Sequence, residues 1–138
     1  MTEIEELKSL LSDNDYTCVI KKSDNIITST ERGIKPVITI LKDNINALKG
    51  AVVCDKVIGR AAALLFVYGG ISAVHTMVIS KTALEVFEKN NISVTYDKLV
   101  NRIQNRTKTG LCPMETLAMD ITSPADAYDF FSKIELKG

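Results

Sequence analysis

The chain has 138 residues, of which 46% are hydrophobic and 25% charged; these values fit one domain over residues 1–138 and exclude a disordered chain. Lys and Arg number 17, as do Asp and Glu, so the formal net charge is 0, and we expect no nucleic-acid partner. Three cysteines without CxxC spacing exclude a disulfide framework and a standard zinc site.

The first third of the sequence predicts a helix followed by a β-hairpin. Apolar residues recur at helical spacing over 2–13, in an acidic segment that does not have the pattern of a signal peptide. We therefore expect a cytoplasmic protein. Residues 16–20 and 26–29 are separated by a polar turn and predict the two strands of the hairpin. A helix that begins at Pro36 follows, with a buried face of Val37, Ile38, Leu41 and Ile45.

The middle of the chain predicts a short strand over 51–54 and a helix over 55–68 that is capped by Asp55. Residues 61–68 are apolar on every side, so we expect this helix to be buried all round. The uncharged run 61–80 is interrupted by glycines and polar residues. It therefore predicts a helix and then a strand, and we expect no membrane partner.

The remaining pattern continues to alternate between strands and helices. This alternation predicts an α/β fold, a three-layer sandwich whose mixed sheet carries helices on both faces. The predicted elements are a strand over 73–79, a helix over 81–90 with Ala83, Leu84 and Phe87 inward, a strand over 92–96, and helices over 97–104, 113–120 and 125–134.

The segment 55–60 is a candidate ligand site, because a strand feeds a helix there. Open α/β sheets bind ligands at that edge, and free amide groups with the helix dipole favour an anion. Lys56 and Arg60 would add positive charge. The alternative is an ordinary capped helix with two solvated basic side chains.

Cys112 is a candidate for direct chemistry. Pro113 suits the first helical position, which puts Cys112 at the cap, where the dipole favours a thiolate. Glu115 would bond back to the cap. The alternative is a buried, inert thiol. If Lys56 lies close to Cys112, the two form one site.

Two further features have weaker signals. If residues 101–108 are helical, Arg102 and Arg106 lie one turn apart on one face, as do Asn101 and Asn105; such a face could grip a phosphate or carboxylate, or simply be solvated. His75 is the only histidine, and we expect it to be a satisfied core or surface residue. A single histidine excludes a multi-histidine metal site, and no GxGxxG, Walker A or GxSxG pattern occurs.

The chain contains three motifs in order: residues 55–63, Asn105-Arg106-Thr107 and Cys112-Pro113-Met114-Glu115. Together these motifs resemble an uncharacterised prokaryotic family, domain of unknown function family 1893. The likeness covers nearly the whole chain. It implies a variant of the cytidine deaminase fold, whose zinc enzymes carry His-x-Glu and Pro-Cys-x-x-Cys at the starts of two core helices. Here those places hold Cys54-Asp55-Lys56 and Ser80-Lys81-Thr82-Ala83, so we expect no zinc, no other cofactor and no deamination.

Three functions remain open at this point. The first is binding of a small anionic, nucleotide-like ligand. The second is a cysteine-dependent enzyme, a transferase or a redox enzyme, with Cys112 as nucleophile. The third is a non-catalytic scaffold that forms a homo-oligomer. The residues expected to hold the ligand are Asp55, Lys56, Gly59, Arg60, Asn105, Arg106 and Glu115.

Overall fold

The computed structural model describes residues 3–31, 33–102 and 117–133, which contain a five-stranded mixed sheet with helices on both faces. The strands are β1 (Cys18–Lys22), β2 (Asn25–Ser29), β3 (Val52–Ile58), β4 (Ala73–Ser80) and β5 (Ser93–Val100). The helices are α1 (Glu3–Asp13), α2 (Lys35–Asp43), α3 (Arg60–Gly69), α4 (Lys81–Lys89) and α6 (Pro124–Ser132). The predicted α/β class is therefore confirmed.

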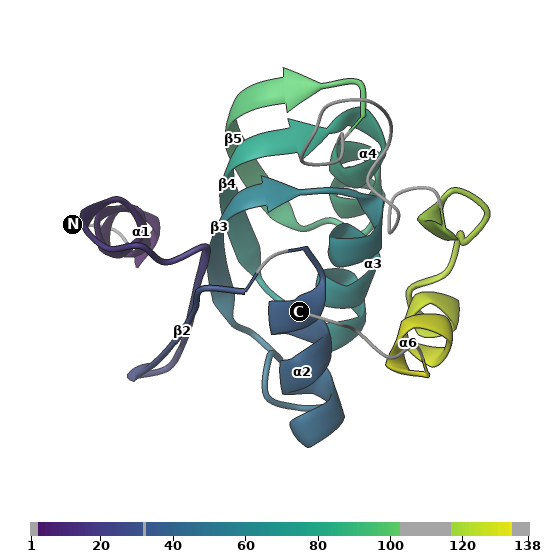
Figure 1. Cartoon of the computed structure of the whole chain (residues 1–138), viewed down its shortest axis with the longest axis horizontal. Helices are drawn as coiled ribbons and strands as arrows, with labels where there is room; N and C mark the ends of the chain where they lie inside the picture. Colours follow the sequence, from purple (N-terminus) through teal and green to yellow (C-terminus); the bar gives the residue numbers. More distant parts are fainter. Residues whose placement is uncertain (1–2, 32, 103–116, 134–138) are drawn as a thin grey trace.

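The sheet has the strand order β2-β1-β3-β4-β5. Strand β1 runs antiparallel to both of its neighbours, whereas β3, β4 and β5 are parallel. Among the described residues, α1 is the one helix on its face of the sheet, and α2, α3 and α4 cover the other face, with α6 packed outside α3 (Figure 1). In the part of the chain that is described, no helix is both long and apolar enough to cross a membrane.

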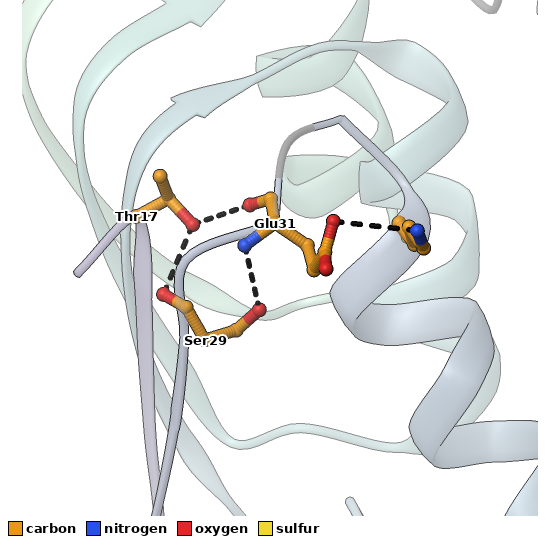
Figure 2. Close-up of polar contacts among 4 residues, drawn as sticks. Thr17, Ser29 and Glu31 are labelled. Carbon is orange, nitrogen blue, oxygen red and sulfur yellow. Dashed lines mark hydrogen bonds and ion pairs between the residues drawn. The ribbon is translucent and has the colours of Figure 1, made fainter. Parts of the chain in front are cut away.

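The hairpin forms as predicted, with Ile20 of β1 opposite Ile27 of β2. Polar contacts among Thr17, Ser29 and Glu31 hold the chain where it leaves the hairpin after β2 (Figure 2). The Thr17 hydroxyl lies against the carbonyl oxygens of Ser29 and Glu31, and the Glu31 amide donates to Ser29 Oγ at 3.0 Å. The Glu31 carboxylate pairs with Lys35 Nζ at 3.4 Å, which links the hairpin to the start of α2.

Helix α2 buries Val37, Ile38 and Leu41, as predicted. The expectation for Ile45 is wrong, because its side chain is 42% exposed. The helix ends at Asp43 and the next residue is extended, so Ile45 no longer follows the helical period.

The main correction concerns the segment that follows. Strand β3 continues to Ile58, and Asp55 lies inside it instead of capping a helix. Val57 and Ile58 pair with Val78 and Ile79 of the parallel strand β4. These β-branched residues suit a strand, so the helix begins only at Arg60, after Gly59 as its N-cap.

Helix α3 is the buried centre of the fold, as predicted, with residues 61–66 and Gly69 buried. A Cβ atom at Gly69 would lie 2.9 Å from Leu48 Cβ, so only glycine allows this close approach. Gly70 then ends the helix in the left-handed conformation, with φ 79°.

The prediction of a helix over 97–104 is wrong at its start, because β5 extends to Val100. Tyr96, Lys98 and Leu99 stand opposite β4 residues in parallel register, and this non-local pairing decides the conformation. The last helix is confirmed: Ser123 Oγ accepts from the Asp126 amide at 3.1 Å and caps α6.

Two separate apolar cores result. The larger one fills the space between the sheet and α2, α3, α4 and α6. The smaller one lies beneath α1 on the opposite face and consists of the buried residues Leu7, Leu11, Val19 and Cys54.

Candidate functional site

Four polar or charged residues among those described are buried, and all of them lie in β3 or β4. They are Asp55, His75, Thr76 and Ser80, each with 6% or less of its surface exposed. Because successive side chains of a strand point to opposite faces, these residues are divided between the two faces of the sheet. Two distinct candidate sites follow from this division.

Asp55 belongs to the face covered by α3. It stands opposite Cys18 in the antiparallel register, and Cys18 is part of the larger core. Asp55 Oδ1 accepts a hydrogen bond from the Val57 amide at 3.3 Å. Burial raises the pKa of this carboxyl to about 7, although hydrogen bonds from the Val57 amide, the Cys18 thiol and the Lys56 amide oppose the shift. Asp55 can therefore hold or release a proton near neutral pH.

Lys56 follows Asp55 inside β3 and is half-buried. Its amide donates to the Thr17 carbonyl oxygen at 3.0 Å. The helix start expected at Asp55 and Lys56 is therefore wrong, because α3 begins only at Arg60. The expectation assumed a helical turn where the chain is extended.

Gly59 and Arg60 do lie at the start of α3. Gly59 has no side chain to cap the helix, and its carbonyl accepts from the Ala63 amide at 3.0 Å. The Arg60 guanidinium is engaged with the chain itself. Its Nη2 donates to the Ile121 carbonyl at 2.7 Å, and its Nε lies 3.1 Å from the Ala118 carbonyl oxygen. Arg60 thus ties α3 to the segment that leads into α6.

Replacing Arg60 by lysine should destabilise the protein by about 1–3 kcal/mol, because one ammonium cannot reproduce the forked donation to both carbonyls. The measurement is urea unfolding of Arg60→Lys beside Arg102→Lys, a control at an exposed position. Equal unfolding midpoints for the two variants would show that the Arg60 contacts contribute nothing.

The start of α4 lies beside that of α3, since Ile58 and Ile79 are register partners and the two helices pack together. Ser80 is the N-cap, and its Oγ accepts from the Ala83 amide at 3.2 Å. Exposed Lys81 opens the helix. The starts of α3 and α4 are therefore neighbours, and the first is Gly59-Arg60 and not the expected Cys54-Asp55-Lys56.

The second candidate site lies on the α1 face, around His75. Its Nδ1 is 2.7 Å from Thr95 Oγ1, and its Nε2 is 3.5 Å from Asp97 Oδ1. Nε2 is buried and makes no hydrogen bond. Burial is the main cause that lowers the pKa of His75; Lys8 lowers it further and Asp97 opposes both. Sequence reasoning missed this cluster because it assigned Asp97 to a helix.

The two cysteines that are described are buried, one on each face of the sheet. Burial raises the pKa of Cys54 to about 12, and it raises the pKa of Cys18 well above the ordinary thiol value. Neither thiol is activated as a nucleophile.

The remaining predicted site residues, Asn105, Arg106, Cys112 and Glu115, lie outside the described residues. The cysteine-dependent enzyme and the shared Lys56–Cys112 site therefore stay predictions. Within residues 3–31, 33–102 and 117–133, no group of three His, Cys, Asp or Glu side chains could hold a metal ion.

Comparison with known proteins gives a family and a solved structure that is similar to this chain. A family described as "Domain of unknown function (DUF1893)", TM1506, matches residues 6–134. The crystal structure of a DUF1893 family protein, TM1506, from Thermotoga maritima is similar, with a TM-score of 0.84 and 28% sequence identity. The match covers 97% of this chain and 93% of that one. No curated protein matches the chain.

Proposed function

Because the chain belongs to the DUF1893 family, whose description names no activity, we propose from its own geometry that it binds a small anionic ligand where α3 and α4 begin. One observation carries this proposal. The two helices start side by side after neighbouring parallel strands, with Ile58 and Ile79 in register. Their dipoles therefore point positive ends at the same place, the edge at which open α/β sheets bind ligands.

The chemistry of the two helix starts supports an anion. The first turn of α3 follows Gly59, so no side chain caps its amides. Ala61 and Ala62 in that turn are buried, and buried amides need an acceptor. Lys81 stands exposed at the first position of α4 and would supply a full positive charge. A carboxylate or phosphate group would satisfy both features.

Asp55 contributes a second property to this proposed site. It lies on the same face of β3 as α3, and its carboxyl can be protonated near neutral pH. A protonated carboxyl can donate a hydrogen bond to an anion, whereas a carboxylate would repel it. Ligand binding at this edge should therefore weaken as the pH rises through about 7.

We also infer that the architecture is a variant of the cytidine deaminase fold. The order β2-β1-β3-β4-β5, with one antiparallel hairpin and three parallel strands followed by buried helices, supports this inference. The residues at the two helix starts are Gly59-Arg60 and Ser80-Lys81-Thr82, which offer no zinc ligand of the deaminase pattern. Zinc-dependent deamination is therefore not the activity that we propose.

Titration with inorganic phosphate, followed by the amide NMR signals, tests the proposal. We expect saturable shifts in the first turn of α3. Lys81→Gln should weaken the affinity about two- to fivefold, because a charge near a helix N-terminus contributes about 0.3–1 kcal/mol. Lys89→Gln removes the same charge from the far end of α4 and is the matched control. Shifts that do not saturate, or equal losses in both variants, would reject this site.

A further inference from the structure

Helix α1 is held to the sheet through a small apolar core of its own. It packs against β1, β3 and β4 on a face that no other helix in the described part of the chain covers (Figure 1). The four buried residues of this core come from α1 itself and from β1 and β3, and the core does not merge with the larger one. One ion pair, Lys21 Nζ to Glu6 Oε2 at 3.1 Å, adds to this attachment. Because this core is separate from the larger one, α1 can open locally without disturbing the packing on the other face of the sheet.

His75 lies on this same face. It is the register partner of Cys54, which belongs to the core beneath α1, and of Thr95 on β5. Only 4% of the His75 surface is exposed. Its Nδ1 is held by Thr95, but its buried Nε2 has no hydrogen bond and could carry a second proton only as a buried cation.

The ionisable groups that face His75 come from three elements. Lys8 of α1 opposes a positive imidazole, Asp97 of β5 favours it, and the neutral Cys54 thiol of β3 does neither. Release of α1 would remove the repulsion from Lys8 and the cost of burial. The attraction of Asp97 would remain, since Asp97 belongs to β5 and not to α1. A proton on His75 is therefore better accommodated when α1 is undocked.

We propose that α1 is a pH-controlled cover: protonation of His75 releases α1 from the sheet and exposes the surface formed by Val19, Cys54 and His75. The direction follows from linkage. Because His75 binds its proton less readily with α1 docked, the docked state loses stability as the pH falls below the ordinary histidine range near 6.5.

The protein contains its own reporters of this motion. Cys54 is covered by α1, whereas Cys18 is buried on the opposite face. The opening of each face is measured by the thiol labelling rate of the native protein, divided by the rate for the denatured chain at the same pH. Mass spectrometry assigns the label to Cys18 or Cys54. Between pH 7.5 and 5.5 the relative labelling of Cys54 should rise by up to about tenfold, while that of Cys18 stays constant.

Variants identify the group responsible. His75→Asn cannot titrate, and its amide can still bond to Thr95, so the rise at Cys54 should vanish. Lys8→Gln, at an exposed position, should reduce the rise in Cys54 labelling, and it provides the test if His75→Asn does not fold. Ser9→Ala, on the same helix, should leave the rise unchanged and is the control. Constant Cys54 labelling in the wild type, an undiminished rise in His75→Asn, or a parallel rise at Cys18 would overturn the proposal.

Discussion

When the pH is raised from 5 to 8, the Asp55→Asn variant should gain about 2–3 kcal/mol in its free energy of unfolding relative to the wild type. In the folded protein, burial raises the pKa of the Asp55 carboxyl to about 7. In the unfolded chain it titrates near pH 3.9. The folded state therefore keeps a proton that the unfolded state has already lost. The resulting stabilisation is complete at low pH, where both states are protonated, and is lost progressively as the pH rises from about 4 to 7.

Asparagine should remove this dependence because it keeps an acceptor for the Val57 amide and carries no charge. The measurement is the free energy of unfolding by urea at pH 5 and pH 8, compared as the difference between the two proteins so that contributions of other groups cancel. Asp43→Asn makes the same chemical change at an exposed position and is the control. If the free energies of unfolding of the wild type and Asp55→Asn change equally between pH 5 and pH 8, the folded state does not hold the Asp55 carboxyl in a desolvated environment.

Enlarging Ala62 to leucine should cost about 1–3 kcal/mol or more, because a well-packed core cannot accept extra carbon atoms without strain. Ala62 is 4% exposed on the central helix α3, which packs against α2, α4 and α6 and shares the larger core with buried residues of the sheet. For a domain of this size the loss corresponds to a melting temperature lower by roughly 3–10 °C. Ala125→Leu makes the identical change at an exposed position of α6 and should melt close to the wild type. Equal melting of the two variants would contradict the packing of α3.

The sequence pattern predicted the parts of the fold that depend on local periodicity. Residues 61–66 are apolar on all sides, and a helix of that kind has to be enclosed. The end of α3 at Gly70 and the serine cap of α6 likewise depend on local residues alone. These features need no knowledge of what lies across the sheet.

The errors occur where pairing with a distant strand decides the conformation. Asp55 and Asp97 are good cap or turn residues by themselves, yet both lie inside parallel strands. Once Asp55 and Lys56 are extended, neither of them lies at a helix start, and the expected ligand cluster loses that position. In the same way, the contact between His75 and Asp97 exists only because β4 and β5 are adjacent.

The placement of the two buried cysteines has a consequence for oxidation of the protein. Cys18 and Cys54 belong to adjacent antiparallel strands, but Cys54 stands opposite Val19 and the two thiols point to opposite faces. A disulfide needs both Cβ vectors to converge, so the sheet itself stands between the sulfur atoms. Oxidants should therefore leave this pair reduced while the fold is intact. An intramolecular bridge between Cys18 and Cys54 would mark chains that had unfolded at the centre of the sheet before they were oxidised.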